Sequence, residues 1–126
     1  MAQKPFIVIA EDEKAYGKVY VNKLTSEGLD VVWVSNGADV IPTLLKRKPD
    51  LLVLDLIMPG MDGFNILKQL RQIRELQDLR VLVASNLSQD IDKARVAEYQ
   101  IYSYFVKSDL SIGEVTEKIM QALPKK

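Results

Sequence analysis

Short apolar runs alternate along the chain with segments whose apolar residues recur every three or four positions. Short runs rich in Val, Ile and Leu are typical of strands buried on both faces, whereas the longer period is typical of helices that cover a sheet. The runs predict β-strands over residues 6–10, 29–34, 51–55, 81–84 and 101–106.

Each predicted strand is followed by a predicted helix, and several helix ends carry a local signal. Gly28 is a stop for the first helix, Asp62 a cap for the third, and Ser111 with Glu114 a capping box for the fifth. We expect the fourth helix to be capped by Ser88. Each helix should turn one apolar face toward the sheet. In order from the first helix to the fifth, these faces carry Tyr16, Val19, Tyr20 and Leu24; Ile41, Leu44 and Leu45; Phe64, Leu67, Leu70 and Ile73; Ile91, Ala94 and Ala97; and Ile112, Val115, Ile119 and Leu123.

This alternation predicts an α/β fold built from right-handed βαβ units. The sheet should be parallel and doubly wound, with helices on both faces, and residues 1–126 should form a single domain.

The composition limits the partners and the cellular compartment that we expect for the protein. Seventeen Lys and Arg balance seventeen Asp and Glu, so the chain has no general charge footprint for nucleic acid or an anionic membrane. The longest uncharged stretch, residues 81–89, is too short to cross a bilayer. The absence of Cys suits a reducing compartment, and we expect a cytoplasmic protein that contacts neither nucleic acid nor membrane.

The chain also has no His. Without Cys and His there is no thiolate nucleophile, no Ser–His pair and no ordinary zinc or copper site. Any bound metal must be held by oxygen atoms, which favours Mg²⁺, Mn²⁺ or Ca²⁺.

Ionisable residues stand where the predicted strands end, and in an open parallel sheet ligands bind at those carboxyl ends. Glu11 and Asp12 follow the first strand, Asp55 the third and Lys107 the fifth, while Ser85 follows the fourth. Converging carboxylates repel unless a cation is present, and Mg²⁺ suits such a cluster. Carboxylates with a metal, a lysine and a hydroxyl form a site for phosphoryl transfer, in which an aspartate can be the nucleophile.

These residues lie in motifs whose order resembles that of bacterial response-regulator receiver domains, the phospho-acceptors of two-component signalling, and the single-domain chemotaxis receivers among them. The resemblance implies a flavodoxin-like sheet with strand order 2-1-3-4-5. The most specific motif surrounds Asp55 and ends in Met-Pro-Gly-Met-Asp-Gly. The matching segments are residues 7–12, 54–63, 84–85 and 104–107.

The resemblance implies a role for each matching residue. Asp55 corresponds to the aspartate that accepts a phosphoryl group from the phosphohistidine of a sensor histidine kinase or phosphotransfer protein. Together with Asp55, Glu11 and Asp12 correspond to the residues that bind Mg²⁺, or Mn²⁺ in its place. Ile57 corresponds to the position whose backbone carbonyl is a further metal ligand.

Three more positions complete the set implied by the resemblance. Ser85 and Lys107 correspond to the residues that bind the phosphoryl group, and Tyr104 to the aromatic residue that turns inward on phosphorylation. The partner-binding face is formed by the fourth helix, the fifth strand and the fifth helix. We expect a signalling domain that acts on its own phosphoryl group only, binds a downstream protein, and is a monomer or a phosphorylation-dependent dimer.

Three positions depart from the usual pattern. Ser108 replaces the proline that commonly follows the lysine, so a cis peptide bond is not expected there. Asn86 replaces a small residue, and Ile57 offers no side-chain hydrogen bond to an attacking water. We therefore expect slow autodephosphorylation.

The same residues allow other interpretations. A lone Asp55 would more often cap the following loop, but its convergence with Glu11, Asp12 and Lys107 favours a functional site. The same fold could serve as a phosphorylation-independent interaction module. A flavin carrier would need a phosphate-binding loop after the first strand, and an Asp-x-Asp phosphatase would need a carboxylate at Ile57.

Overall fold

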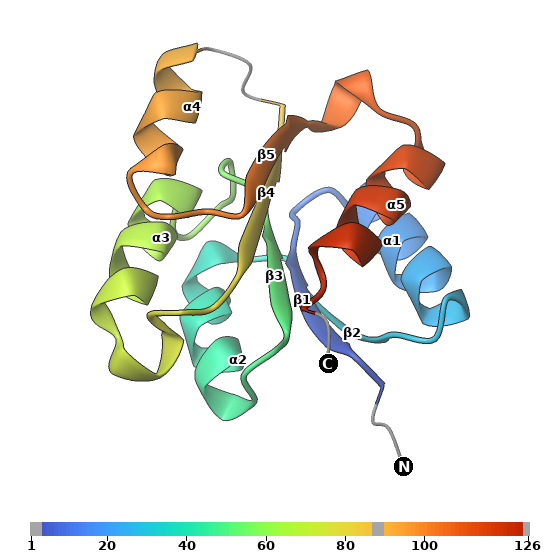
Figure 1. Ribbon diagram of the computed structural model, residues 1–126, viewed down its shortest axis with the longest axis horizontal. Coiled ribbons are helices and arrows are strands. Elements are labelled where there is room, and N and C mark those ends of the chain that lie inside the picture. Colours follow the sequence, from blue (N-terminus) through green and yellow to red (C-terminus); the bar gives the residue numbers. More distant parts are fainter. Residues whose placement is uncertain (1–3, 87–89, 125–126) are drawn as a thin grey trace.

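The computed structural model describes residues 4–86 and 90–124, with the backbone alone for 90–93, and shows one parallel sheet. Its strand order is β2-β1-β3-β4-β5, which confirms the expected order (Figure 1). The strands are β1 (Phe6–Ala10), β2 (Asp30–Val34), β3 (Leu51–Leu54), β4 (Val81–Ser85) and β5 (Ser103–Val106).

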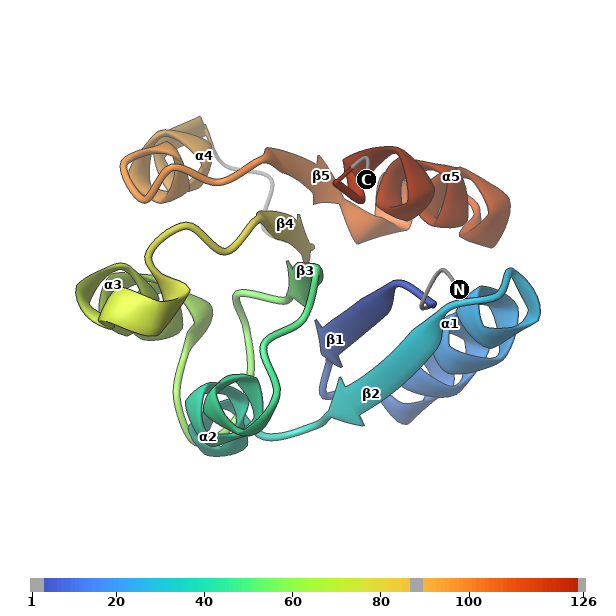
Figure 2. The ribbon, with the colours of Figure 1, turned by 60° about the horizontal axis from the view of Figure 1, so that its bottom comes forward.

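Helices cover both faces of this sheet (Figure 2). They form one group on each face, which is the arrangement of a doubly wound fold. The first group is α1 (Lys14–Ser26) and α5 (Ile112–Ala122), and the second is α2 (Val40–Lys46), α3 (Gly63–Gln72) and α4 (Asp90–Ala97). Short 3₁₀ turns η1 (Gly37–Asp39), η2 (Arg74–Leu76) and η3 (Lys107–Asp109) complete the described elements.

The sheet separates two apolar cores. Along β1, Ile7 and Ile9 pack into the core beneath α1 and α5, while Val8 and Ala10 pack into the core beneath α2, α3 and α4. The central strands β1, β3 and β4 are buried on both faces. The edge strand β2 is only half covered, and Val32 is exposed. None of the helices in the described ranges is long and apolar enough to span a membrane.

Three of the predicted signals at the helix ends are confirmed. Gly28 has φ +90°, a conformation that favours glycine, and it follows Glu27, the C-cap residue of α1. Ser111 and Glu114 form the expected capping box of α5. The side chain of Asp62 accepts a hydrogen bond from the backbone N–H of Asn65 and caps α3. All peptide bonds among the described residues are trans, including that between Lys107 and Ser108.

The predicted inward faces were partly wrong. Ala94 and Ala97 are exposed, whereas Val96 is buried, among the α4 side chains that the structure describes. The branched side chain of Val96 removes more apolar surface from water than an alanine methyl group, which explains the shifted face. Val19 and Leu45 are also exposed, because Tyr20, Leu24 and Leu44 fill the cores beneath α1 and α2. Ser88 and the side chain of Ile91 lie outside the described part.

Some strand boundaries also differ. Strand β5 begins at Ser103, two residues later than predicted, because Ile101 and Tyr102 belong to the connection from α4. Strand β3 ends at Leu54, so Asp55 is the first residue beyond it.

Candidate functional site

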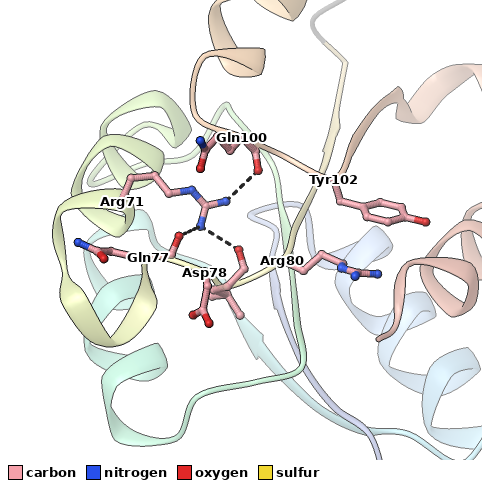
Figure 3. A pocket seen from close by; sticks show the side chains of 7 residues that line it. Arg71, Gln77, Asp78, Arg80, Gln100 and Tyr102 are labelled. Atoms are coloured by element: carbon pink, nitrogen blue, oxygen red, sulfur yellow. Dashed lines mark hydrogen bonds between the residues drawn. The ribbon is translucent and has the colours of Figure 1, made fainter. Parts of the chain in front are cut away.

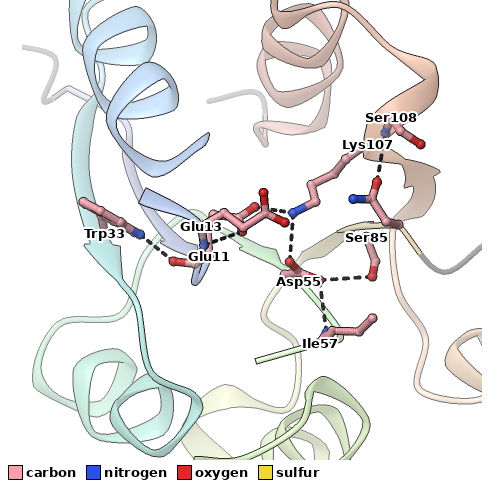
Figure 4. A network of polar contacts seen from close by, with 9 residues as sticks. Glu11, Glu13, Trp33, Asp55, Ile57, Ser85, Lys107 and Ser108 are labelled. Carbon is pink, nitrogen blue, oxygen red and sulfur yellow. Dashed lines mark hydrogen bonds and ion pairs between the residues drawn. The ribbon is translucent and has the colours of Figure 1, made fainter. Parts of the chain in front are cut away.

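Four polar side chains meet at the carboxyl edge of the sheet (Figure 4). Glu11 directly follows β1, Asp55 follows β3, Ser85 ends β4 and Lys107 begins η3 after β5. All four are buried, with exposed fractions of 4% or less. Buried polar groups are stable only when they are paired, so their contacts define the site.

Lys107 links the two buried carboxylates. Its Nζ lies 2.6 Å from Oε1 of Glu11 and 2.9 Å from Oδ2 of Asp55. Burial alone would lower the pKa of Lys107, but the hydrogen bonds to Glu11 and Asp55 outweigh burial and raise that pKa above its usual value. The lysine is therefore charged over the physiological range.

The second oxygen of Asp55 accepts two hydrogen bonds. The Ser85 hydroxyl and the backbone N–H of Ile57 each donate to Oδ1 at 3.0 Å. The contact with Ile57 shows that Asp55 does cap the following loop. The contacts with Ser85 on β4 and with Lys107 in the turn after β5 fix the carboxylate in place, which capping does not require.

Glu11 is held from two sides. Lys107 contacts Oε1, and the backbone N–H of Glu13 donates to Oε2 at 3.1 Å. Burial raises the pKa of Glu11 to about 7, although the hydrogen bonds from Lys107 and Glu13 act in the opposite direction. The Glu11 carboxyl group therefore gains or loses its proton at pH values close to neutral.

Glu11, Asp12 and Asp55 form a possible metal centre. Each offers a carboxylate oxygen, and these oxygens lie within 4.8 Å of one another. Asp12 is more exposed than the other two, so the cluster is open toward solvent. A set of oxygen ligands with an open side fits Mg²⁺ or Mn²⁺, which retain bound waters.

The remaining predicted residues lie around this cluster. The side chain of Ile57 is 54% exposed at the rim, and its backbone carbonyl as a metal ligand stays a prediction. Tyr104 on β5 pairs in register with Val83 and is half-buried against the core beneath α2, α3 and α4. Its inward movement likewise stays a prediction.

Two aromatic residues next to the site carried no functional prediction. The Nζ of Lys107 lies 4.5 Å from the ring centre of Tyr16, which helps to shield the ammonium group. The indole N–H of Trp33 donates to the backbone carbonyl of Glu11 at 2.7 Å. The one sequence signal for the latter contact is Gly17 within a predicted helix, because glycine there often marks a close approach.

A hollow of about 250 Å³ lies where β4 and β5 begin, at the edge of the sheet opposite the site (Figure 3). Its main cation, Arg71, donates hydrogen bonds to the backbone carbonyls of Leu76, Gln77, Leu79, Tyr99 and Gln100. These contacts use the donors of the guanidinium group to join α3 to the starts of both strands. The hollow is therefore a structural junction.

Comparisons with known proteins agree with this geometry. The family model described as "Response regulator receiver domain" matches residues 7–119. A probable transcriptional regulator, ycf27 of Pyropia yezoensis, is 30% identical over 105 residues, which are 83% of this chain and 42% of that protein. The chain thus spans less than half the length of the curated relatives it matches.

Solved structures share the fold. The chemotaxis response regulator CheY4 of Vibrio cholerae superposes with a TM-score of 0.87 at 16% identity, over 96% of this chain and all (100%) of that one. The Mn²⁺-bound form of response regulator Rcp1 superposes with a TM-score of 0.82 at 20% identity, over 96% and 99% of the two chains.

Proposed function

The chain belongs to the family of response regulator receiver domains, and from this premise we propose that Asp55 accepts a phosphoryl group from the phosphohistidine of a sensor histidine kinase or phosphotransfer protein. The observation that carries the proposal is the Asp55 carboxylate, buried between the Lys107 ammonium and the Ser85 hydroxyl. A buried carboxylate beside a fixed cation and a hydroxyl donor is suited to nucleophilic phosphoryl transfer.

The transfer exchanges one bond for another. A carboxylate oxygen of Asp55 forms a bond to phosphorus while the bond between phosphorus and the donor's imidazole nitrogen breaks. The imidazole leaves with the bonding electron pair and takes up a proton from solvent. Lys107 stays next to Asp55 and neutralises negative charge on the phosphoryl oxygens, because its charge and position are fixed by two ion pairs.

A divalent cation, Mg²⁺ or Mn²⁺, would supply further charge neutralisation at the phosphoryl oxygens. Glu11, Asp12 and Asp55 would hold it, with the backbone carbonyl of Ile57 as an additional ligand. The acidic cluster of this chain supports that assignment, and the Mn²⁺-bound form of Rcp1 is a precedent for such an ion on the same fold.

Phosphorylation would change the structure through Ser85. A phosphoryl group adds nearly two negative charges at pH 7 and strong acceptor oxygens. The Ser85 hydroxyl now donates to Asp55, and we expect it to move to the phosphoryl group. Tyr104 lies one strand away and would turn into the space that Ser85 leaves, altering the face formed by α4, β5 and α5 for a downstream protein. Autodephosphorylation is expected to be slow, since Ile57 cannot bind the attacking water.

Several expectations from the sequence belong to this proposal. They are a protein that acts only on its own phosphoryl group, a cytoplasmic location, no contact with nucleic acid, and a monomer or phosphorylation-dependent dimer. The alternative of a phosphorylation-independent interaction module predicts that the acidic cluster and Asp55 bind no phosphoryl group or mimic of one.

The phosphoryl mimic beryllofluoride distinguishes the two functions. With Mg²⁺ present, ¹⁹F NMR of the wild-type chain should show bound beryllofluoride at one site. The Asp55→Asn variant should show none, because the amide cannot replace the carboxylate oxygen. Binding that is equal in both chains, or absent from the folded wild type, would favour the phosphorylation-independent module.

A further inference from the structure

The indole of Trp33 reaches from β2 to the loop that carries the acidic pair. Its N–H donates to the backbone carbonyl of Glu11 at 2.7 Å, as Figure 4 shows. The backbone N–H of Glu11 in turn donates to the carbonyl of Val34 at 2.9 Å. Both backbone polar groups of Glu11 are therefore bound to the neighbouring strand, which fixes the peptide plane that leads into Asp12.

Gly17 makes this contact possible. A Cβ atom at position 17 would overlap the ring atoms Cε2, Cζ2 and Nε1 of Trp33. Glycine is a poor helix former, yet Gly17 is buried within α1. The indole thus lies directly on the backbone of α1 at Gly17, and from there its N–H reaches the carbonyl of Glu11.

Asp12 depends on the backbone of this loop. The Glu11 carboxylate is held by Lys107 and by the N–H of Glu13. Among the residues that the structure describes, by contrast, the Asp12 carboxylate has no hydrogen bond or ion pair. Its distance from Glu11 and Asp55 is consequently set by the direction in which the chain leaves Glu11.

We propose that Trp33 is a positioning residue for the divalent metal site, and that Gly17 leaves on α1 the space that the Trp33 indole occupies. The hydrogen bond from the indole holds the Glu11–Asp12 peptide so that the acidic oxygens are preorganised before the cation arrives. The inference rests on the proposed function, which supplies the reason for a metal at Glu11, Asp12 and Asp55.

Isothermal titration calorimetry, which measures the affinity of the purified chain for Mg²⁺ alone, tests this role. Trp33 is the only tryptophan, so biosynthetic replacement by benzothienylalanine exchanges the N–H for sulfur at a single site without changing the ring shape. That protein and Trp33→Phe should bind Mg²⁺ about fivefold more weakly, the effect of losing one hydrogen bond. Gly17→Ala should weaken binding as well, because it displaces the indole.

Two controls separate positioning from general destabilisation. Gly113→Ala changes a helical glycine in α5 that lies outside this contact and where a Cβ has ordinary space, and it should leave Mg²⁺ affinity unchanged. In Trp33→Phe combined with Gly17→Ala, the loss of affinity should not exceed the larger single loss, because both changes break the same contact. At saturating Mg²⁺, phosphorylation of Trp33→Phe by acetyl phosphate should return to within about twofold of the wild-type rate.

The outcomes are distinct. Wild-type Mg²⁺ affinity in the folded benzothienylalanine protein would overturn the positioning role and leave the proposed function standing. Slower phosphorylation of Trp33→Phe at saturating Mg²⁺, with unchanged affinity, would also overturn it and assign Trp33 to packing alone. A wild-type chain that binds no Mg²⁺ and accepts no phosphoryl group would overturn both proposals together.

Discussion

The side-chain oxygen of Asn86 accepts a hydrogen bond from the backbone N–H of Ser108, with 3.0 Å between the two atoms. Asn86 follows Ser85, and Ser108 follows Lys107, so this bond joins the segments that carry two site residues. Both positions depart from the pattern of receiver domains. Proline at position 108 would have no N–H to donate, so the two departures form one contact.

This contact should protect the backbone amide of Ser108 from hydrogen exchange. In Asn86→Ala, the amide of Ser108 loses its acceptor, and its hydrogen exchange measured by NMR should accelerate about two- to fivefold. Asn86→Asp keeps an acceptor oxygen and serves as the control. Equal exchange of the Ser108 amide in wild type and Asn86→Ala would show that the bond does not hold the two segments together.

Replacing Lys107 by methionine should strongly destabilise the fold. The change leaves the Glu11 and Asp55 carboxylates buried without their cation, and breaking such a pair costs about 3–5 kcal/mol. Urea unfolding at pH 8 measures the loss of free energy of unfolding, and Lys48→Met, which breaks the exposed pair with Asp78, should change it little. A similar loss of free energy of unfolding in Lys107→Met and Lys48→Met would contradict the claim that burial makes the ion pairs of Lys107 matter more than an exposed pair.

Glu11 should make stability depend on pH. Its pKa rises from the usual value of 4.5 to about 7 in the folded protein, so between these values the folded chain retains a proton that the unfolded chain releases. The contribution of Glu11 to the free energy of unfolding is therefore complete below pH 4.5 and is lost as the pH rises toward 7. Because the chain has no His, few other groups titrate between pH 5 and 8.

Urea unfolding of wild type and Glu11→Gln at several pH values between 5 and 8 isolates this effect. The free energy of unfolding of the wild type should fall relative to that of the variant as the pH rises, and then level off above pH 7. A constant difference between the two chains across this range would contradict the raised pKa.

Arg71→Lys should weaken the junction at the other end of the sheet. The planar guanidinium donates to five carbonyl groups, whereas an ammonium group cannot reach them from one position. We expect a loss of about 2 kcal/mol in the free energy of unfolding, measured with urea. Arg74→Lys, at a nearby exposed residue in η2, is the matched control. Equal stability of the two variants would refute the structural role.

The sequence predicted the features that depend on local pattern. Apolar runs place Asp55 and Lys107 at strand ends, and parallel pairing then brings those ends to one edge of the sheet. The inward face of α4 was not predictable in the same way, because its alanines and Val96 give only a weak apolar stripe. The spacing of apolar residues alone did not show which face of α4 is buried.

Contacts between distant segments were also missed. The bond from Trp33 to the Glu11 carbonyl spans 22 residues, and that from Ser108 to Asn86 also spans 22. In each bond the donor and the acceptor meet only once the sheet has packed, so neither bond produces a periodic pattern in the sequence. The close approach at Gly17 is the one local trace of the first contact.

Intact-protein mass after incubation with acetyl phosphate tests the central claim most directly. Wild type and Asp55→Asn should be compared with and without Mg²⁺. The account predicts one added phosphoryl group on the wild type, dependent on Mg²⁺, and none on Asp55→Asn. A folded wild-type chain that gains no phosphoryl group, or an Asp55→Asn chain that gains one as readily, would contradict the assignment of Asp55 as the phospho-acceptor.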